Sequence, residues 1–352
     1  MVRHYYSPDY NYLFNMETGV HLRWGVTEEQ DALYAPFPEI ADIEVSTTCH
    51  GVKGKPCPHC YKSNTGKGKN MPLRVIQSLL DSIPQELTQV ALGVGDSKAN
   101  PDLLAIMDEC RHRNIIPNIT INGDGLDDQE AADLASRCGG IAVSNYDKQT
   151  CYTAIARLRQ AGASCLYIHQ LLSEETLAAC FQVLHDASQT SALTGLKAVV
   201  FLSLKEKGRG KSFTRIQAPD TYRQLFFLAR QLKVGLGFDS CSAPVFLHEQ
   251  QSQLKKLLPY VDCCEAGLFS IYINVDGEAF PCSFTEGTPD WETGLLVAGR
   301  DFSSEVWHHP RMESWREALL ASPGNCPGCK VAPHCHRCPV YNLTPCFTPE
   351  SS

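Results

Sequence analysis

Residues 40–60 read IADIEVSTTCHGVKGKPCPHC, and this stretch decides the fold. Its first seven residues, 40–46, form a short apolar run that is typical of a buried strand. Three cysteines, Cys49, Cys57 and Cys60, follow directly on that run. Ligands of α/β proteins gather at the carboxyl ends of the strands. The segment therefore predicts a strand that delivers three thiols to a ligand-binding edge.

Outward from this segment, short β-rich runs alternate with longer amphipathic stretches. Six β-then-α units in series predict parallel strands joined by helical crossovers, in an α/β barrel or a doubly wound sheet. Before them, two short strand-like runs flank a Glu-Thr-Gly turn within 12–24 and predict a lead-in hairpin. The expected strands are 40–46, 89–93, 115–121, 141–144, 165–169 and 196–203, and the expected helices are 72–83, 101–113, 127–138, 148–161, 173–188 and 218–233.

After about residue 240 this periodicity ends, and the chain becomes rich in Cys, Pro, Gly and Trp. One hairpin stands out at 270–280, where an Asp-Gly pair separates two alternating apolar runs. A region with so little periodic core is expected to depend on metal ligands for its stability.

Composition excludes several classes of protein. The chain has 352 residues, of which 43% are hydrophobic and 20% charged, and this is ordinary globular composition. Its net charge of −8 gives no basic field that would attract nucleic acid or anionic lipid. No apolar run reaches the roughly 18 residues of a membrane span, and the amino end lacks the apolar core of a secretory signal. We therefore expect a cytoplasmic protein.

The 17 cysteines are the unusual figure. An odd count without a signal peptide does not fit a disulfide framework, and thiols in a reducing compartment more often serve metals or chemistry. Three cluster early and nine lie between 241 and 346. The other five are expected to be small buried hydrophobes within regular segments: Cys110, Cys138, Cys151, Cys165 and Cys180.

The early triplet can bind iron. Three thiolates can hold three irons of a [4Fe–4S] cluster, which normally takes four cysteine ligands. The open iron can then chelate S-adenosylmethionine (SAM) and deliver an electron to its sulfonium. The alternative is a zinc site, for which His50 or His59 would supply the fourth ligand.

Small and polar residues follow the next three predicted strands. The run 93–96 ends the second strand, Asn122 ends the third, and Ser144 ends the fourth. Small residues at such a point let the backbone approach a bound amine or ribose. Each is a common turn by itself, but their position on consecutive strand ends after a cysteine loop is specific.

With these motifs, the sequence from about residue 39 onward resembles the radical SAM family. The family's Cys-x3-Cys-x-aromatic-Cys loop is matched with its first gap widened to seven residues. The resemblance implies a partial (β/α)6 TIM-type barrel over 39–240, after a lead-in hairpin at 1–38. It places His59 at the position that packs on adenine, and 94–97 at the Gly-Gly-Glu-Pro motif. The implied SAM-binding residues are His59, Tyr61, Gly93, Val94, Gly95, Asp96, Asn122 and Ser144.

The late cysteines resemble the SPASM extension of radical SAM enzymes, which implies an auxiliary iron–sulfur domain over 241–352. The matching pattern is Gly277-x4-Cys282 followed by Cys-x2-Cys-x5-Cys-x2-Cys from Cys326. The resemblance implies three [4Fe–4S] clusters in the chain. Nine thiols serve eight auxiliary ligand positions, which leaves Cys263 or Cys264 spare. The implied ligands are Cys241, Cys264, Cys282 and Cys338 for auxiliary cluster I, and Cys326, Cys329, Cys335 and Cys346 for auxiliary cluster II.

A zinc ribbon is the alternative for these late cysteines, because Cys-x2-Cys pairs also bind zinc and two histidines, His334 and His336, lie nearby.

Two basic runs border the predicted ligand face. The first comprises Lys53, Lys55, Lys62, Lys67 and Lys69, and the second comprises Lys205, Lys207, Arg209 and Lys211. Either could dock an acidic peptide or cover the site, and Gly208 and Gly210 would give the second run the mobility of a lid. The alternative is that both are solvated loop charges.

The resemblance implies an enzyme that uses a 5′-deoxyadenosyl radical to modify a ribosomally made precursor peptide. Ser283 follows Cys282 at the position where sulfatase maturases usually have a carboxylate, and this difference weakens the resemblance to sulfatase maturases. The widened loop favours splicing or excision of the peptide backbone, and a crosslink is the other expected product. The expected partners are the precursor peptide, a separate leader-recognition protein and an external electron donor. The general base is not identified by the sequence, although Asp239, Glu265 and Asp96 are candidates near the predicted mouth.

Two other hypotheses remain. One is a radical SAM enzyme that acts on a small molecule or on a protein side chain, as sulfatase maturases do. The other is a non-catalytic zinc or iron–sulfur scaffold.

Overall fold

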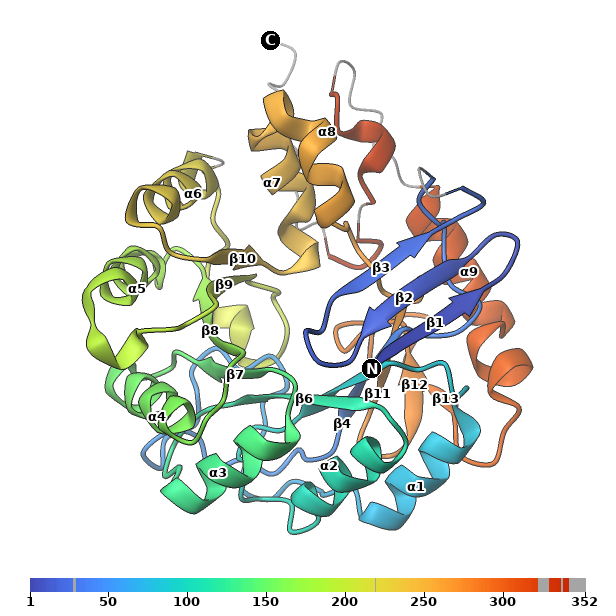
Figure 1. Cartoon of the computed structure of the whole chain (residues 1–352), viewed down its shortest axis with the longest axis horizontal. Coiled ribbons are helices and arrows are strands. Elements are labelled where there is room, and N and C mark those ends of the chain that lie inside the picture. Colours follow the sequence, from blue (N-terminus) through green and yellow to red (C-terminus); the bar gives the residue numbers. More distant parts are fainter. Residues whose placement is uncertain (28–29, 219, 322–328, 337, 342–352) are drawn as a thin grey trace.

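The computed structural model describes residues 1–27, 30–218, 220–321, 329–336 and 338–341. Its centre is a curved sheet whose strands follow one another around a ring (Figure 1). Neighbouring strands in this sheet are neighbours in sequence from β4 to β10, and all of these are parallel. They are β4 (Ile40–Glu44), β5 (Gln89–Gly93), β6 (Ile116–Ile121), β7 (Ile141–Ser144), β8 (Leu166–Leu172), β9 (Ala198–Ser203) and β10 (Leu236–Phe238).

Six helices connect these strands and cover the outer side of the ring (Figure 1). A sequential strand order with every crossover on one side is that of a barrel, whereas a doubly wound sheet reverses its order partway. The predicted barrel-type α/β fold is thus confirmed, and β10 adds a short seventh parallel strand to the six expected. The helices are α1 (Leu73–Ser82), α2 (Leu103–His112), α3 (Asp128–Arg137), α4 (Lys148–Gln160), α5 (Leu177–Gln189) and α6 (Asp220–Leu232).

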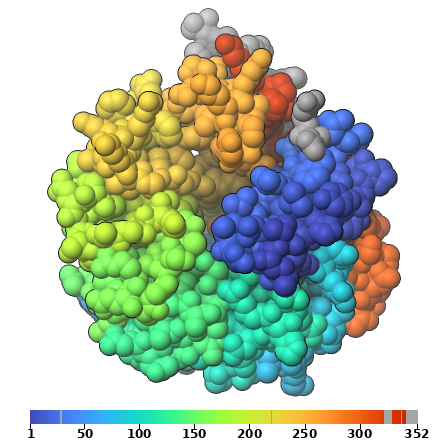
Figure 2. All heavy atoms as spheres, viewed as in Figure 1, coloured from blue at the N-terminus to red at the C-terminus, as the bar shows by residue number. Residues whose placement is uncertain are grey.

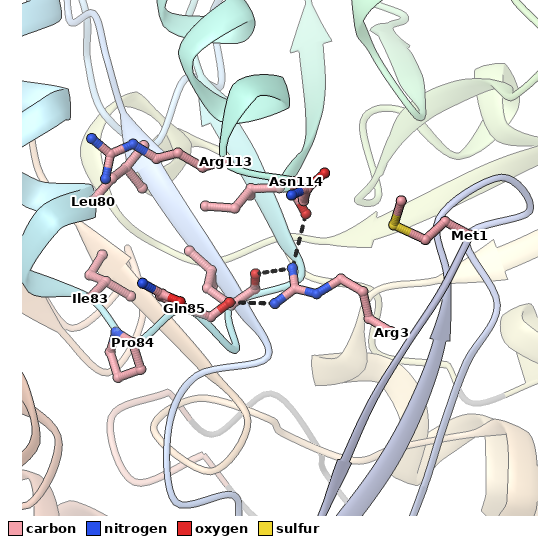
Figure 3. A pocket seen from close by; sticks show the side chains of 10 residues that line it. Met1, Arg3, Leu80, Ile83, Pro84, Gln85, Arg113 and Asn114 are labelled. Atoms are coloured by element: carbon pink, nitrogen blue, oxygen red, sulfur yellow. Dashed lines mark hydrogen bonds between the residues drawn. The ribbon is translucent and has the colours of Figure 1, made fainter.

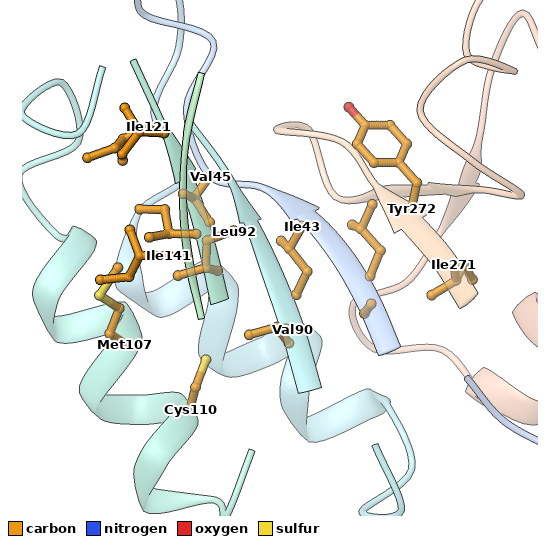
Figure 4. Close-up of a cluster of buried hydrophobic side chains, with 14 of the residues drawn as sticks. Ile43, Val45, Val90, Leu92, Met107, Cys110, Ile121, Ile141, Ile271 and Tyr272 are labelled. Atoms are coloured by element: carbon orange, nitrogen blue, oxygen red, sulfur yellow. The ribbon is translucent and has the colours of Figure 1, made fainter. Parts of the chain in front are cut away.

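The core lies between the sheet and these helices (Figure 4). Strand alternation determines which residues enter it. Ala41 and Ile43 of β4 are almost fully buried against the helix side, so Asp42 and Glu44 point to the inner side of the ring. Figure 2 shows the surface hollowed at the centre of the ring, between the β8–β10 segment and the N-terminal strands.

The N-terminal strands form a separate antiparallel sheet. The predicted hairpin is β2 (Asn11–Asn15) with β3 (His21–Trp24), and β1 (Val2–Tyr6) adds a third strand that the sequence analysis did not identify. Tyr12 and Phe14 are buried on the face that packs against the barrel. The sheet therefore adds a second, aromatic core.

This small sheet packs at the amino ends of the barrel strands. Arg3 donates to the carbonyl of Leu87 at 2.8 Å and to that of Asn114 at 2.9 Å, and these residues immediately precede β5 and β6 (Figure 3). A cavity of 390 Å³ beside Arg3 also lies here. Both features are at the opposite end of the strands from the loop that carries Cys49.

The C-terminal part joins the same sheet through β11 (Ser270–Ile273), which runs parallel to β4. The predicted hairpin continues into β12 (Glu278–Phe280) and then β13 (Leu295–Leu296). The C-terminal part also contains helices that the sequence analysis did not identify: α7 (Ala243–Glu249), α8 (Leu254–Leu257), a π-helical turn (Phe302–Trp307) and α9 (Pro310–Leu320). Within the described ranges, no helix combines the length and the apolar character that crossing a membrane requires.

A buried arginine connects the three parts. The Arg23 side chain is only 10% exposed and stacks on the Phe269 ring, with its guanidinium carbon 3.6 Å from the ring centroid. It forms ion pairs with Glu39 at 3.2 Å and with Asp262. Glu39 also accepts a hydrogen bond from the Tyr10 hydroxyl at 2.7 Å. Arg23 comes from the small sheet, Glu39 immediately precedes β4, and Asp262 precedes β11.

We predict that Arg23→Met lowers the free energy of unfolding by about 3–5 kcal/mol, because the Glu39 carboxylate would remain buried without its cation. Urea titration of the full chain measures this change. Lys69→Met is the matched control, since Lys69 and its partner Asp276 are 67% and 54% exposed and such a pair contributes little. Equal stabilities of the two variants would contradict the role given to Arg23.

Candidate functional site

The early cysteines lie together at the carboxyl end of β4. Cys57 is buried, and Cys49 and Cys60 are half-buried. The three thiols are close enough for a charge on one to shift the pKa of another. In the metal-free protein, burial and the two neighbouring thiols raise the pKa of Cys57 to about 12, although Arg209 opposes the shift. Burial also raises the pKa of Cys49. Iron would replace these protons, because thiolates are the metal-binding form.

Two glycines at the end of β5, Gly93 and Gly95, allow close packing against the β4 strand and the cysteine loop. A Cβ placed on Gly95 would lie 2.7 Å from the Cys49 sulfur, and one on Gly93 would lie 3.2 Å from the Cα atom of Glu44. Close approach to the cysteine loop therefore requires Gly95. Val94 is partly buried against the core. Asp96 pairs with His50, its Oδ2 atom lying 2.9 Å from the His50 Nδ1 atom.

Asn122 and Ser144 lie at the ends of β6 and β7, as expected. Asn122 is 5% exposed and uses both ends of its amide, donating to the carbonyl of Gly51 at 3.0 Å and accepting from the Asp124 amide at 2.9 Å. Asn122 thus holds the cysteine loop in place. Ser144 is also buried, and its backbone carbonyl accepts from the Tyr146 amide at 2.9 Å.

An aromatic wall stands beside the thiols. The His59 ring lies 5.0 Å from that of Tyr146 and 5.3 Å from that of Phe213, measured between ring centroids. Burial, together with Arg209, lowers the pKa of His59 to about 4, so its ring is neutral at pH 7. Its Nδ1 atom is buried and has no hydrogen-bond partner among the residues that the structure describes. A neutral, partly apolar ring of this kind can stack on a nucleobase.

Tyr61 points elsewhere. Its ring lies 4.5 Å from that of Phe284, in the C-terminal part. The structure therefore groups His59 with Tyr146 and Phe213, which the sequence analysis did not identify, and places Tyr61 between the two cysteine regions. Tyr146 follows Ser144 by only two residues, and this proximity was the one signal that could have identified it.

The second basic run packs onto the cysteine loop and is not a lid over solvent. The Arg209 side chain donates to the carbonyl of Cys57 at 2.8 Å, and its backbone amide donates to that of Cys60 at 3.0 Å. A Cβ on Gly208 would lie 2.2 Å from the carbonyl oxygen of Tyr61. Gly208 therefore permits close packing. The contacts do not support the lid mobility that the sequence analysis expected of this glycine.

Buried lysines join the cysteine loop to the C-terminal part. The Lys62 ammonium lies 3.1 Å from Glu44 and 2.8 Å from the Tyr272 hydroxyl, and it also pairs with Glu286. Lys207 donates to the carbonyl of Glu286 at 2.8 Å. In the first basic run, Lys53 and Lys69 form ion pairs with Asp147 and Asp276. These cations are internally paired, which leaves few of them for docking a peptide.

Within the described ranges, the side chains do not form a single-ion site. Among the residues that the structure describes, no three His, Cys, Asp or Glu side chains are spaced to hold one metal ion. The Nδ1 atom of His50 is engaged by Asp96. A zinc ion would require a compact tetrahedron with a fourth protein ligand. Three thiols on one loop suit a cluster, which spreads its ligands over separate irons.

A second group of thiols lies in the C-terminal part. Cys264 is within electrostatic range of Cys241, Cys282 and Cys338, and Cys241 is likewise within range of the last two. Burial raises the pKa of Cys241 to about 12 and that of Cys282 to about 11. The four residues predicted for auxiliary cluster I are therefore brought together, and an all-thiol donor set of four fits a [4Fe–4S] cluster.

Cys263 belongs to a different group. It packs in a small apolar cluster with Cys335, and Cys329 packs against that cluster. This arrangement favours Cys264 as the auxiliary I ligand and groups Cys263 with Cys335. Cys329 and Cys335 of the predicted auxiliary II set thus lie together, whereas Cys326 and Cys346 lie outside the described residues. His336 is half-buried near the same region.

The candidate bases take positions that the sequence analysis did not foresee. Both Asp239 oxygens are occupied: one accepts from Ser242, and the other accepts from the Ser203 amide at 3.1 Å and pairs with Lys205. Glu265 lies 3.9 Å from Arg23, at the amino end of β4. Asp239 is therefore a structural anchor, and Glu265 lies at the end of the barrel opposite the cysteine loop. Neither position favours a base that acts beside the thiol triplet.

Asp42 is a carboxyl group that the sequence analysis did not consider. It projects from the middle of β4 on the inner side of the ring, where its side chain is open to the hollow of the barrel, and desolvation by the surrounding barrel wall raises its pKa to about 6. A carboxyl group with this pKa can accept a proton near neutral pH. In a β-rich run, such a residue gives no signal until the strand's inner face is known.

Residues 263–339 match the family model of the SPASM iron–sulfur cluster-binding domain. Among solved structures, Streptococcus suis SuiB bound to precursor peptide SuiA aligns with a TM-score of 0.69 at 13% identity, over 95% of each chain. SuiB bound to S-adenosylmethionine gives 0.63 at 14%, over 86% of this chain and 72% of that one. Native anSMEcpe with bound AdoMet and Cp18Cys peptide gives 0.60 at 15%, over 84% and 87%. No curated protein matches the chain.

These findings confirm the predicted SPASM-type domain and the barrel fold expected from the family resemblance. The SPASM match includes Cys264, Cys282 and Cys338, and Cys241 lies before it. The likeness to SuiB extends over almost the whole chain.

The inner wall of the barrel makes stability depend on pH. His169 is half-buried on β8, and burial lowers its pKa from 6.5 to about 4, with Asp239 opposing the shift in part. Between these two values the unfolded chain binds more protons than the folded one, so stability falls as the pH falls below about 6.5. We predict that, between pH 7 and pH 5, the His169→Gln variant loses about 1–2 kcal/mol less folding free energy than the parent protein does.

Urea titrations of the metal-free protein at both pH values measure this effect. His185→Gln, at an exposed position on α5, is the control and should retain the pH dependence of the parent protein. A His169→Gln variant with the same pH dependence as the parent would refute the assignment.

Proposed function

We propose that this protein is a radical SAM/SPASM enzyme that modifies a ribosomally made precursor peptide. The observation that carries the proposal is the position of three mutually close thiols at the carboxyl end of β4, beside the Gly95 approach and the His59 aromatic wall. That arrangement occurs on a barrel that continues into a SPASM domain. We assign 1–38 to the lead-in sheet, 39–240 to the barrel and 241–352 to the auxiliary domain.

In this proposal, Cys49, Cys57 and Cys60 hold a [4Fe–4S] cluster, and the His59 wall receives the adenine of SAM. When bound, the cluster supplies the electron that divides SAM into methionine and a 5′-deoxyadenosyl radical, which abstracts a hydrogen atom from the substrate. Gly93, Val94, Gly95 and Asp96 line the approach through their backbone. Asn122 acts by holding the loop through the Gly51 carbonyl, and Ser144 acts through Tyr146.

The auxiliary thiols complete the assignment. Cys241, Cys264, Cys282 and Cys338 hold one [4Fe–4S] cluster, and the predicted outer set holds a third. Lys62 connects the two regions, because it pairs with Glu44 of β4 and with Glu286 beside the Cys282 turn. This buried network holds the two groups of thiols in a fixed position relative to each other.

A peptide is the substrate class that the comparisons support. SuiB was solved with its precursor peptide and anSMEcpe with a peptide, and both share this fold. We further propose that the reaction splices or excises part of the peptide backbone or forms a crosslink. We also propose that a separate leader-recognition protein and an external electron donor are its partners, and that it acts in the cytoplasm. Asp42, on the inner wall, is the proton acceptor that we favour over Asp239 and Glu265.

We predict that anaerobically reconstituted protein contains about twelve irons per chain, which corresponds to three four-iron clusters. The Cys49→Ala, Cys57→Ala, Cys60→Ala variant should retain about eight irons and lose reductive SAM cleavage. Iron and sulfide analysis, together with chromatography of 5′-deoxyadenosine, measures both quantities.

Cys165→Ala is the matched control. It removes a half-buried thiol outside both cysteine groups and should change neither quantity. SAM cleavage by the triple variant would refute the assignment, and zinc in place of iron would support the scaffold hypothesis.

We predict that co-expression with a precursor peptide encoded beside this gene changes the mass of that peptide, and that the triple cysteine variant leaves the mass unchanged. Tandem mass spectrometry locates the change. A loss of residues indicates excision, whereas a loss of two hydrogens indicates a crosslink. If SAM cleavage proceeds but only a small molecule is consumed, the small-molecule hypothesis replaces the peptide one.

A further inference from the structure

Lys205 is a buried cation that the proposed reaction does not yet use. It lies two residues beyond the end of β9, and its side chain is only 5% exposed. Its ammonium pairs with Asp239 and lies 4.9 Å from the centroid of the Phe284 ring. A lysine is rarely buried to this degree unless its charge has a partner.

These contacts place the ammonium between two cysteine turns. Asp239 caps the turn Ser240–Ser242, which carries Cys241, by accepting from the Ser242 amide at 3.1 Å. Phe284 follows Cys282 by two residues, and the carbonyl between them, that of Ser283, accepts from Lys207 at 2.8 Å. The electrostatic partners of Lys205 include the thiols of both Cys241 and Cys282.

The charge of Asp239 cancels only part of this field. Its carboxylate is also bound by the Ser203 amide and by the Ser242 amide and hydroxyl, which stabilise its negative charge. Among the cations of the described residues, Lys205 is the one whose charge acts most strongly on Cys241.

A cation in this place affects electron affinity. One-electron reduction of a [4Fe–4S] cluster adds one negative charge to it, and hydrogen bonds and nearby charge set the potential of such clusters. A fixed positive charge favours the reduced form, and the effect is larger in a buried site than in water. The aromatic ring and the protein around Lys205 exclude water from this pair.

We propose that Lys205 is a positioning residue that raises the reduction potential of the iron–sulfur cluster held by Cys241, Cys264, Cys282 and Cys338. The inference rests on the proposed function, because it requires that cluster. It assigns Lys205, of the second basic run, to the tuning of electron transfer and not to docking of a peptide. Asp239 keeps the ammonium charged and aimed at the site.

The test is a redox titration with dithionite and mediators, followed by electron paramagnetic resonance. It uses the full chain carrying Cys49→Ala, Cys57→Ala and Cys60→Ala, so that only the auxiliary clusters give signals. We expect Lys205→Met to shift the reduction equilibrium of one cluster at least tenfold toward the oxidised form, which corresponds to about 59 mV for one electron. Lys205→Arg keeps the charge and should remain within about threefold of the parent protein, which is about 28 mV on the same scale. The signal of the other auxiliary cluster should not move.

A second comparison avoids a buried carboxylate without its partner. Asp239→Asn is compared with Asp239→Asn combined with Lys205→Met, and the latter should again have the lower potential. If the Lys205→Met variant takes up no iron, this second comparison of two variants tests the role of Lys205 by itself. Equal potentials within both comparisons would overturn the inference while leaving the proposed function intact. Absence of iron from the parent background would instead refute the auxiliary-cluster assignment itself.

Discussion

The pairing of β4 on both of its sides is the constraint on which the rest of the structure depends. On one side β4 pairs with β5, and on the other it pairs with β11, which arrives from more than two hundred residues later. Ile43 is the shared register point, opposite Leu92 in one pair and opposite Ile273 in the other. Parallel pairing fixes both the spacing and the direction of the strands. The loop that carries the early cysteines and the hairpin that leads to Cys282 are therefore positioned by one strand.

The local charges contrast with the overall charge. The chain carries a net charge of −8, yet the space between the two thiol groups contains Lys62, Lys205 and Lys207. Clusters bound by thiolates carry negative charge, and a protein that buries them must supply cations or hydrogen-bond donors nearby. Read from the sequence, these lysines suggested a docking surface. The structure shows them half-buried or buried between two sites, which is where negative charge would collect.

Sequence reasoning succeeded where a short-range pattern determines the outcome. The expected strand at 89–93 and the expected strand at 141–144 coincide with β5 and β7, because alternation and flanking turns are local properties. It missed α7 and α9, whose short or weakly amphipathic sequences are stabilised by tertiary contacts. Phe246 of α7 packs against Phe226 and Phe238, and Trp315 of α9 donates to the Ala266 carbonyl. It also misplaced Glu265: proximity to Cys264 in sequence suggested the site, but the pairing of β11 with β4 directs the preceding residues toward the amino end of the barrel. Long-range pairing of that kind has no local signature.

The gap between Cys49 and Cys57 is wider than in the family that the sequence resembles, yet the three thiols remain together on one loop. The extra residues leave and return through a tight turn, in which Val52 and Lys55 exchange backbone hydrogen bonds at 2.9 and 3.0 Å. Gly51 makes the turn possible, because its φ is +79° and a Cβ there would lie 1.9 Å from the Lys55 carbonyl oxygen. Lys53 at the tip pairs with Asp147, which caps α4. The inserted residues therefore anchor the loop to the ends of neighbouring strands, and the three sulfurs stay together because the extra length is folded away from them.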